Sequence, residues 1–532
     1  MRFFNTAGPN KPRLHYSIPP LERLDLDEVL ALIRAERYFV LHAPRQTGKT
    51  SALLALRELL NRSGDYRCVY ANVEGAQAAR HDVAAGMRTI LDELRWRARA
   101  TPALGDDSLA DIVTGVIEQT SPLGALAEVL ARWARADPRP LVVFLDEIDA
   151  LVGDTLISVL RQIRSRYDAR PERFPQSVIL CGIRDVRDYR IHTGDGKEIV
   201  TGGSAFNIKA ESLRMGDFSR GETRDLLGQH TRETGQPFTE GALRTVWRQT
   251  RGQPWLVNAL AHQACFRHKP GRDRARPITG DAILDAREEL VVSRQTHLHQ
   301  LSDKLREDRV RRVVEPLLSG SDEGGFTASD LEYTADLGLV ARKPLRIANP
   351  IYAEVLPREL TYAAQESIRT EPTEWYATAE GSLDMSRLLA DFQRFFREHS
   401  EHWVERFRFR EAGPQLLLQA YLQRIVNRGG RIHREYGLGR RRTDLLIEWP
   451  RPETAAPSRR YRRYVVECKL LRDGLERTIA EGLEQTADYM ERCGAEAGHL
   501  VVFDRAPDRA WDEKLFRREA SHAGRTVTVW GA

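Results

Sequence analysis

The segment from residue 38 to residue 56 constrains the fold of this chain more than any other. An apolar run, Tyr38-Phe39-Val40-Leu41-His42, leads into Ala43-Pro44-Arg45-Gln46-Thr47-Gly48-Lys49-Thr50, and the helix-forming residues 51–56 follow. A buried strand that aims a loop at the start of a helix presents free backbone N–H groups to an anion. This strand–loop–helix unit therefore predicts a phosphate-binding loop in an α/β fold.

Within that loop, the residue types predict distinct roles. We expect Lys49 to reach the β- and γ-phosphates of a nucleotide and the Thr50 hydroxyl to hold Mg²⁺. Ala43 replaces the first glycine of the GxxxxGK[ST] pattern, which restricts the backbone at the strand exit but leaves the cradle intact. The predicted nucleotide-binding residues of the loop are Pro44, Arg45, Gln46, Thr47, Gly48, Lys49, Thr50 and Ser51. The alternative is a surface turn that contains Gly-Lys-Thr by chance.

A second motif supports the nucleotide site. Residues 141–149 read Leu-Val-Val-Phe-Leu-Asp-Glu-Ile-Asp, an apolar strand pattern with carboxylates at its C-terminal end. Ligands collect beyond the carboxyl ends of buried parallel strands. We expect Asp146 to bind Mg²⁺ through water and Glu147 to polarise the attacking water. A strand that ends in a solvated acidic turn is the alternative, but the two motifs together favour nucleotide binding with hydrolysis.

The first 215 residues alternate strand and helix patterns, which predicts an α/β fold with a doubly wound parallel sheet. The expected strands are 38–42, 67–73, 141–145, 177–182 and 206–212, and a helical region over 78–136 is broken near residues 101–102 and 121–122. Arg184 follows the fourth strand and is expected to sense the γ-phosphate. An ion pair with Asp185 or Asp188 is the alternative. Arginines also follow the acidic motif, and one of them could act in trans: Arg161, Arg164, Arg166 and Arg173.

Residues 216–298 have helical patterns and are expected to form a lid over the nucleotide. Ser219 and Glu222 have capping-box spacing, and Pro254 lies in a turn that is expected to touch the adenine or the phosphates. The pattern of residues 299–360 predicts two helices (304–318 and 328–336) and two short strands (338–341 and 345–348). The second of these helices is acidic and lacks arginine, whereas phosphate contacts need cations, so it is interpreted as an interdomain element.

These motifs resemble the AAA-like, STAND-type branch of P-loop ATPases. The resemblance covers roughly residues 1–290 and rests on APRQTGKT (Walker A), LVVFLDEID (Walker B), LCGIRDVRDYR and RGQPWLVN, together with the opening segment that includes Gly8-Pro9. The family often has a Gly-x-Pro element in its lid, matched by Gly252-Gln253-Pro254. The resemblance implies a switch or machine driven by ATP and Mg²⁺, with assembly into a homo-oligomer, and residues 299–360 resemble the winged helix that often follows such ATPases.

The C-terminal part contains a second chemical signal. After a linker and helix over 361–404, a strand entered through Arg440, Arg441 and Arg442 carries Asp444, and a later strand carries Glu467 and Lys469. Residues two apart in a strand share a face, so Asp444 would lie opposite this pair if the strands are neighbours. Two carboxylates and the Cys468 carbonyl would form a hard-oxygen site for Mg²⁺ or Mn²⁺. Lys469 would orient the water or stabilise developing charge.

This constellation resembles the PD-(D/E)xK nuclease superfamily over residues 405–532. The expected αβββαβ order is a helix at 414–428, strands at 430–436, 442–448 and 461–470, a helix at 475–492 and a strand at 498–504. The resemblance implies metal-dependent cleavage of nucleic acid, most simply DNA, with Glu411 as an acidic metal partner and with Gln485 and Tyr489 near the substrate. Thr443 replaces the proline that sometimes precedes the aspartate.

Two alternatives remain open. The C-terminal domain could be an inactive fold of the same shape that only binds nucleic acid, and the whole chain could be an ATP-controlled signalling scaffold whose output is oligomerisation. A role in defence or DNA processing is a hypothesis from architecture alone. The chain has 532 residues, a net charge of +5 and five scattered cysteines. We expect a cytoplasmic protein without membrane contact, disulfides or zinc, because no apolar run reaches membrane-spanning length and no paired cysteine spacing occurs.

Overall fold

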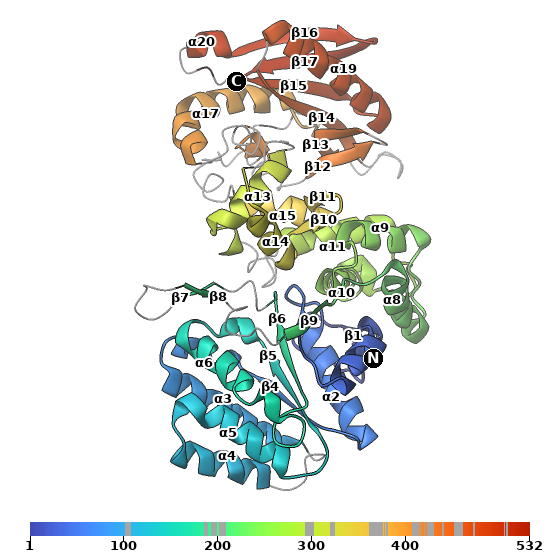
Figure 1. Ribbon diagram of the computed structural model, residues 1–532. Helices are drawn as coiled ribbons and strands as arrows, with labels where there is room; N and C mark the ends of the chain where they lie inside the picture. The colour runs from blue at the N-terminus through green and yellow to red at the C-terminus, as the bar shows by residue number, and fades with distance from the viewer. Residues whose placement is uncertain are drawn as a thin grey trace. The chain divides into compact units, whose positions relative to one another are not determined.

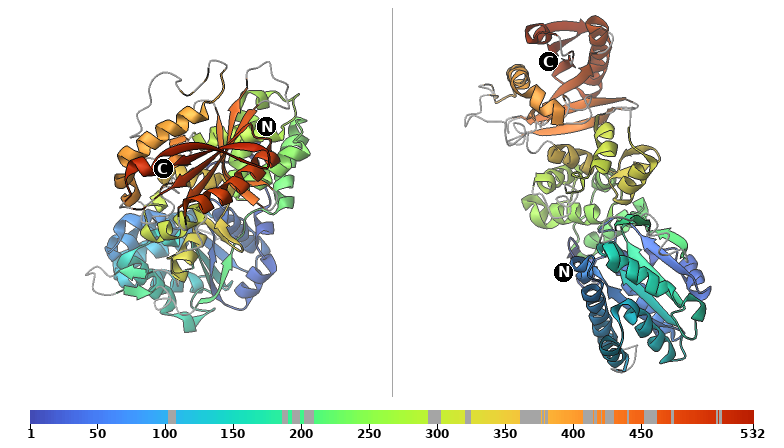
Figure 2. Two further views of the ribbon diagram at one scale, coloured as in Figure 1. Left: turned by 90° about the horizontal axis from the view of Figure 1, so that it is seen from above. Right: turned by 60° about the vertical axis from the view of Figure 1, so that its left-hand side comes forward.

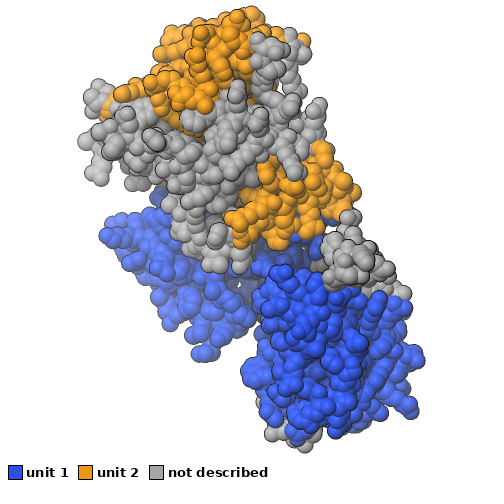
Figure 3. Space-filling view, turned by 90° about the vertical axis from the view of Figure 1, so that its left-hand side faces the viewer, with its two compact units in different colours: residues 1–293, 332–339 blue, residues 294–331, 340–532 orange. Residues whose placement is uncertain are grey.

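The chain folds into two compact units, which Figure 3 distinguishes by colour. Unit 1 comprises residues 1–293 and 332–339, and unit 2 comprises residues 294–331 and 340–532. The structure is a computed structural model that describes residues 1–101, 108–185, 190–192, 199–201, 209–292, 303–319, 325–360, 376, 378, 381–406, 414, 417–419, 421–422, 430–438, 441–451, 461–471, 474–504, 506 and 509–532. Some side chains within these ranges, including that of Asp444, are not described.

Unit 1 is built on a five-stranded, all-parallel sheet with the strand order β4-β5-β6-β3-β9 (Figure 1). The strands are β3 (Tyr38–His42), β4 (Arg67–Asn72), β5 (Leu141–Asp146), β6 (Ser177–Gly182) and β9 (Lys209–Arg214). The predicted parallel α/β sheet is confirmed. β9 ends two residues beyond its expected end at 212, and residues 206–208 lie outside the described part of the chain.

Helices cover both faces of this sheet (Figure 2). Phe39 and Leu41 pack with α1 (Leu26–Arg34) and α2 (Lys49–Ser63), while Tyr38 and Val40 belong to the core on the opposite face. That second core also includes α3 (Val83–Ala100), α4 (Ser108–Gln119), α5 (Pro122–Arg135) and α6 (Gly153–Arg164). Successive strand side chains point to opposite faces, so the continuous apolar strands are buried on both sides.

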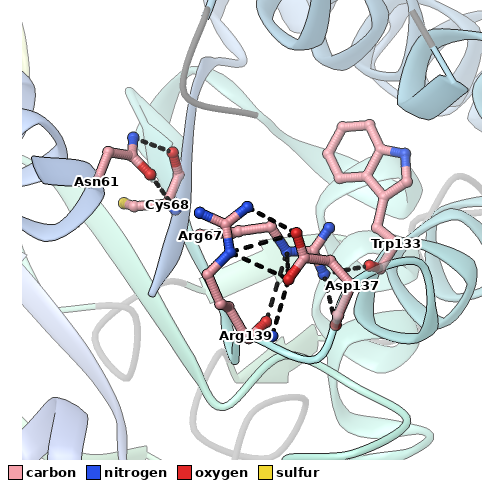
Figure 4. A network of polar contacts seen from close by, with 6 residues as sticks. All are labelled: Asn61, Arg67, Cys68, Trp133, Asp137 and Arg139. Atoms are coloured by element: carbon pink, nitrogen blue, oxygen red, sulfur yellow. Dashed lines mark hydrogen bonds and ion pairs between the residues drawn. The ribbon is translucent and has the colours of Figure 1, made fainter. Parts of the chain in front are cut away.

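A buried arginine ties the sheet to the end of α5 (Figure 4). Arg67 donates from its Nη2 to the Trp133 carbonyl at 2.6 Å, and its Nε lies 3.7 Å from Asp137 Oδ1. Arg139 also binds Asp137, and its hydrogen bond is the main cause that lowers the pKa of Asp137 to about 2. Arg67 is 1% exposed. Because a buried charge is tolerated only when it is paired and hydrogen-bonded, this network fixes the start of β4.

A helical segment follows the sheet, as expected. It comprises α8 (Arg220–Thr234), α9 (Glu240–Thr250), α10 (Pro254–His262) and α11 (Gly280–Val292). The predicted capping box is present, with Ser219 and Glu222 exchanging side-chain and backbone hydrogen bonds. The N-terminal segment packs on these helices, since Trp255 Nε1 donates to the Thr6 carbonyl at 2.9 Å. No described helix combines the length and the apolar composition needed to cross a bilayer.

Short elements complete the central part of the chain. β7 (Arg190–His192) and β8 (Ile199–Thr201) form an antiparallel pair that the sequence did not predict. α13 (Asp308–Ser319) begins four residues after its expected start, and α14 (Ala328–Asp336) has the expected bounds. β10 (Val340–Arg342) and β11 (Leu345–Ile347) are antiparallel, and α15 (Pro350–Leu360) follows.

Unit 2 contains a mixed six-stranded sheet with the order β12-β13-β14-β15-β17-β16. β12 (Arg431–Leu438), β13 (Arg441–Pro450) and β14 (Tyr461–Leu470) are antiparallel, and β15 (Ala497–Phe503) runs parallel to β14 after α19 (Leu475–Cys493). α17 (Met385–Arg406) and α19 pack into the cores on opposite faces (Figure 2, left). β16 (Phe516–His522) and β17 (Arg525–Gly531) form a hairpin that the expected αβββαβ order lacks.

Charged side chains hold the three antiparallel strands in register. Glu448 of β13 lies 2.9 Å from His433 Nε2 of β12 and 2.9 Å from Arg463 Nε of β14. Burial alone would raise the pKa of Glu448, but the hydrogen bond and charge of His433 and the charge of Arg463 hold it at about 2. A carboxylate bound from both neighbouring strands opposes a slip of either strand by one residue.

The thiols are mostly enclosed. All five cysteines lie in the described part of the chain, and none of them forms a disulfide. Cys68, Cys181, Cys265 and Cys493 are buried, whereas Cys468 of β14 has intermediate exposure. Burial raises the pKa of the Cys68 and Cys181 thiols well above the ordinary value. These two thiols therefore behave as small apolar side chains of the unit 1 core.

Buried His499 predicts that unit 2 loses stability in acid. Trp530 Nε1 donates to His499 Nδ1 at 3.3 Å, and burial lowers the pKa of His499 to about 4. In the unfolded chain this histidine takes up a proton near pH 6.5, whereas in the folded chain it does so only near pH 4. The free energy of unfolding therefore decreases as the pH falls from about 6.5 to about 4. The expected loss between about pH 7.5 and about pH 5 is roughly 2 kcal/mol.

Hydrogen exchange of the β15 and β17 amides, corrected for intrinsic rates, measures this loss. His499→Phe should remove the histidine's share of the pH dependence, whereas the control His522→Phe replaces an exposed histidine and should leave it unchanged. Equal pH slopes for the wild type and His499→Phe would contradict the assignment.

Candidate nucleotide and metal sites

The loop after β3 has the local structure that its sequence predicts. Gly48 is the N-cap of α2 with φ 99°, a left-handed conformation that glycine adopts without steric cost. Thr47 Oγ1 donates to the Pro44 carbonyl at 2.8 Å, and Lys49 Nζ donates to the carbonyls of Ala43 and Pro44 at 3.0 and 3.1 Å. Lys49 is 5% exposed. The lysine amine is therefore enclosed by the loop that would surround a phosphate.

The loop meets the acidic motif through a hydroxyl–carboxylate contact. Thr50 Oγ1 donates to Asp146 Oδ2 at 2.7 Å, and the Tyr70 hydroxyl donates to the same oxygen at 2.9 Å. Asp146 is fully buried. A hydroxyl and a carboxylate are the hard oxygen ligands that Mg²⁺ prefers. The structure thus brings together the two residues predicted to share the ion, and it adds Tyr70, which holds the carboxylate in place.

Glu147 follows Asp146 in an unusual backbone conformation. Its φ is 59° and its ψ is 39°, in the left-handed region that non-glycine residues rarely adopt. Burial and the neighbouring Asp149 raise the pKa of Glu147, and Asp149 itself accepts a hydrogen bond from the Ile183 backbone at 3.0 Å. A partly buried carboxylate with a raised pKa suits a general base better than an ordinary exposed one.

Arg184 lies beside a segment that the sequence did not connect with the loop. Its guanidinium lies 5.0 Å from the centre of the Tyr333 ring, and Arg214 Nη2 donates to the Ala335 carbonyl at 3.2 Å. A Cβ added to Gly338 would lie 2.8 Å from Pro44 side-chain atoms. Residues 332–339 therefore pack against the phosphate-binding loop. Asp188, one alternative partner of Arg184, lies outside the described residues.

The N-terminal segment connects the start of α2 with the helical segment. Pro254 is buried and begins α10, with Gln253 as the N-cap. The Ser51 hydroxyl accepts a hydrogen bond from the Asn10 backbone at 3.0 Å. The N-terminal segment thus contacts both α2 and, through Thr6, Trp255 of α10. Contact of Pro254 with a nucleotide stays a prediction.

The arginines considered for action in trans have different environments. Arg161, Arg164 and Arg173 are exposed, whereas Arg166 forms a 2.9 Å ion pair with Glu128. An arginine that acts on a neighbouring subunit has to be free to reach it. Exposure therefore favours Arg161, Arg164 and Arg173 over Arg166 as the arginine that could act in trans.

In unit 2, the strand register supports the second predicted site. Leu445 of β13 is opposite Val466 of β14, so Asp444 and Glu467 are the next positions along the two strands. Lys469 Nζ lies 3.3 Å from Glu467 Oε1, and Glu467 is 3% exposed. The side chain of Asp444, and all of Glu411 and Arg440, lie outside the part that the structure describes.

The structure corrects one expectation about unit 2. Tyr489 was expected near substrate, but it is buried against the sheet in the core that contains Leu446 and Val465, because the apolar face of α19 turns inward there. Gln485 has intermediate exposure. Cys468 packs its side chain against the core on the α17 side, and its backbone carbonyl stays the predicted ligand. Within the described side chains, no three His, Cys, Asp or Glu residues form a cluster suited to a metal ion.

Two residues that the sequence did not single out, Tyr70 and Arg23, contact the candidate nucleotide site. Tyr70 had a readable signal, because its hydroxyl interrupts an apolar strand near the strand's carboxyl end. Arg23 lies in a short turn of helix (Pro20–Arg23), and its Nη1 donates to the Thr47 carbonyl at 3.0 Å. Nothing in the spacing of Arg23 relative to the loop indicates this contact, because it depends on tertiary packing.

A parallel α/β sheet with a Gly-Lys-Thr loop after one strand and a hydrogen-bonded aspartate at the end of another defines a P-loop nucleotide-binding fold. No protein-family model matches the chain, and no curated protein matches it. Among solved structures, it is similar to the Walker-type ATPase PABY2304 of Pyrococcus abyssi, with 14% identity and a TM-score of 0.44 over 66% of this chain and 99% of that chain.

Two further solved structures show weaker similarity. Cdc6p from Pyrobaculum aerophilum has 16% identity and a TM-score of 0.35 over 69% of this chain and 97% of that chain. The RuvB Holliday junction branch migration motor of Thermotoga maritima has 13% identity and a TM-score of 0.32 over 63% of this chain and 94% of that chain. The function of the present chain therefore has to be inferred from its own residues.

Proposed function

We propose that the protein binds ATP with Mg²⁺ at the loop after β3 and hydrolyses it. The observation that carries this proposal is the 2.7 Å hydrogen bond from Thr50 to Asp146. It places the hydroxyl of the predicted phosphate loop and the carboxylate of the acidic motif within reach of one ion. A chance Gly-Lys-Thr turn would have no reason to meet a buried aspartate from another strand.

In this proposal, different residues of the site bind the phosphates, hold Mg²⁺ and accept the proton. Gly48 and its neighbours offer backbone N–H groups at the start of α2 to the phosphates, and Lys49 would exchange the carbonyls of Ala43 and Pro44 for phosphate oxygens. Thr50 and Asp146 would hold Mg²⁺, which neutralises phosphate charge when bound. Glu147 would accept the proton of the attacking water, as its raised pKa favours.

Lys49→Met tests this assignment. Loss of the charge-assisted hydrogen bonds to phosphate should raise the Kd for ATP by about tenfold to a hundredfold. Isothermal titration calorimetry with Mg–ATP on the full-length protein measures it. The control Lys269→Met removes an exposed lysine and should bind like the wild type. A Kd unchanged by Lys49→Met would remove the loop from the proposal.

For unit 2 we propose a metal-dependent nuclease that acts on DNA. The proposal rests on the register that makes Asp444 and Glu467 adjacent on neighbouring strands, and on the 3.3 Å contact between Glu467 and Lys469. Two carboxylates on paired strands are hard oxygen donors that fit Mg²⁺ or Mn²⁺. A bound ion would supply an activated water and stabilise the phosphate charge.

In this proposal Lys469 pairs first with Glu467 and later with the attacking water or the phosphate. It is held by Glu467 before the ion binds, and it would then be free to orient the attacking water or to stabilise the negative charge that develops on the phosphate. Glu467 is nearly fully buried, so an unpaired charge there would be costly. The 3.3 Å contact with Lys469 therefore supplies this buried carboxylate with a partner of opposite charge.

We further propose that ATP occupancy in unit 1 licenses cleavage in unit 2, in a homo-oligomer that places an exposed arginine of one subunit at the nucleotide of the next. The competing hypothesis is an ATP-controlled signalling scaffold in which unit 2 binds nucleic acid without cutting it. The two hypotheses differ in one observable, which is phosphodiester cleavage by the wild-type protein with Mg²⁺ or Mn²⁺.

A further inference from the structure

Arg23 makes four contacts with three parts of unit 1: the phosphate-binding loop, the connection from β9 to α8, and α8 itself. Its Nη1 donates to the Thr47 carbonyl in the phosphate-binding loop at 3.0 Å, and its Nη2 donates to the Gly216 carbonyl. The guanidinium lies 4.5 Å from the centre of the Phe218 ring, and its Nε lies 3.6 Å from Glu222. The side chain is only 7% exposed. An arginine enclosed in this way is held in one orientation.

The contact with Thr47 determines where the next backbone N–H points. In a planar trans peptide the carbonyl and the following N–H point in opposite directions. Because Arg23 holds the Thr47 carbonyl, the N–H of Gly48 is directed away from Arg23. Gly48 begins α2, where free N–H groups bind anions. Arg23 therefore pre-orients one of the donors that the loop would offer to a phosphate.

The other contacts connect Arg23 with the helical segment. Gly216 and Phe218 lie between the end of β9 and the start of α8. The Phe218 backbone N–H donates to the Gly252 carbonyl at 2.8 Å, and Gly252 precedes the Gln253 cap of α10 by one residue. A Cβ added to Gly252 would lie 2.0 Å from the Phe218 carbonyl oxygen. Movement of the 216–218 segment would therefore be transmitted to the start of α10.

We propose that Arg23 is a positioning residue that couples phosphate binding in the loop to the position of the helical segment α8 to α11. This inference rests on the proposed nucleotide function. A phosphate on the Gly48 N–H fixes the Thr47–Gly48 peptide, the peptide fixes the guanidinium, and the guanidinium fixes Gly216 and Phe218. Without Arg23 the loop still has Lys49 and Thr50 to bind the nucleotide, but the helical segment no longer responds to it.

Hydrogen exchange of the full-length protein, with and without Mg²⁺ and a non-hydrolysable ATP analogue, tests this coupling. In the wild type the analogue should slow exchange of peptides covering 216–224 and 252–262 by about tenfold or more. In Arg23→Met this response should shrink to less than about twofold, while the analogue still binds within about tenfold of the wild-type Kd. The control Arg34→Met removes an exposed arginine of α1 and should respond like the wild type.

Steady-state kinetics provide an independent measurement. Turnover at saturating ATP should fall by about tenfold or more in Arg23→Met, with KM changed by less than about threefold, because binding is retained and closure is lost. Arg23→Lys keeps the charge but not the forked geometry, and it should show an intermediate exchange response. This variant decides the question if Arg23→Met does not fold.

The possible outcomes separate the inference from the function on which it rests. Full nucleotide-dependent protection in Arg23→Met, or in Arg23→Lys if only that variant folds, would overturn the coupling while ATP binding stands. Binding without any protection in the wild type would overturn it as well. A wild-type protein that does not bind the analogue at all would refute the proposed function and this inference together.

Discussion

Replacement of Glu147 by glutamine is expected to slow ATP turnover by about 10²- to 10⁴-fold while the Kd for ATP changes by less than about threefold. The substitution preserves shape but removes the group that would accept a proton from water. Lys49, Thr50 and Asp146 are untouched, so the phosphates and the ion keep their ligands. Phosphate release at saturating ATP and calorimetric titration measure the two quantities.

The pH dependence of turnover gives a second test of the same residue. A base must be ionised to act, and burial followed by the charge of Asp149 raises the pKa of Glu147 above its ordinary value of 4.5. Turnover should therefore decline as the pH falls through that raised value, at a higher pH than an unperturbed glutamate would give. Glu147→Gln should lack this acidic limb.

Glu58 of α2 provides a matched control for Glu147. Glu58→Gln neutralises an exposed carboxylate of α2 that pairs only with Arg62 on the same helix among the described contacts. It should retain wild-type turnover and the acidic limb. If Glu147→Gln also retained both, Glu147 would have no part in hydrolysis, although the loop could still bind ATP.

In unit 2, Asp444→Asn and Lys469→Met should each reduce metal-dependent DNA cleavage by about 10³-fold or more and leave ATP turnover unchanged. The first removes a carboxylate that would hold the ion, and the second removes the cation beside Glu467. Cleavage of supercoiled plasmid with Mg²⁺ or Mn²⁺, followed on gels in parallel with phosphate release, measures both activities in one preparation.

The control for this pair is Glu484→Gln, which neutralises an exposed carboxylate of α19. It should cut DNA like the wild type. Activity that survives in Asp444→Asn would place the metal elsewhere. Absence of cleavage by the wild type on plasmid, linear, single-stranded and RNA substrates, with either ion and with ATP, would leave the scaffold with a silent nucleic-acid-binding unit as the better hypothesis.

The sequence predicts the central sheet well because its signals are local. Residues 38–42 and 141–146 are continuous apolar runs that end in polar residues, and both become buried parallel strands. The glycine at position 48 and the capping box at Ser219 likewise depend on nearest neighbours, and the structure contains both. Such features are decided by backbone conformation and by short-range periodicity, so one sequence suffices to read them.

The β16–β17 hairpin also has a local signal that was not recognised. Two residues, Ala523 and Gly524, separate the strands, and both have positive φ. A two-residue loop of this kind matches the twist of the flanking strands. The αβββαβ order ends at residue 504, so it does not include a hairpin at residues 516–531.

Contacts between distant segments could not be predicted. Arg23 with Thr47, Tyr333 with Arg184 and Gly338 with Pro44 join residues far apart in the chain. One sequence contains no periodicity or spacing that reports such pairs. The face on which Tyr489 lies is a related case, since an aromatic residue on a helix suits either a substrate or a core, and packing against Leu446 and Val465 decides for the core.

The enclosed cysteines have a practical consequence for labelling. With four thiols buried and Cys468 of intermediate exposure, Cys468 is the native cysteine most open to a maleimide reagent. It lies between Glu467 and Lys469 on the same strand, with its side chain on the opposite face. A fluorophore placed there would sit one residue from both proposed nuclease groups, so unit 2 carries its own reporter position without an engineered cysteine.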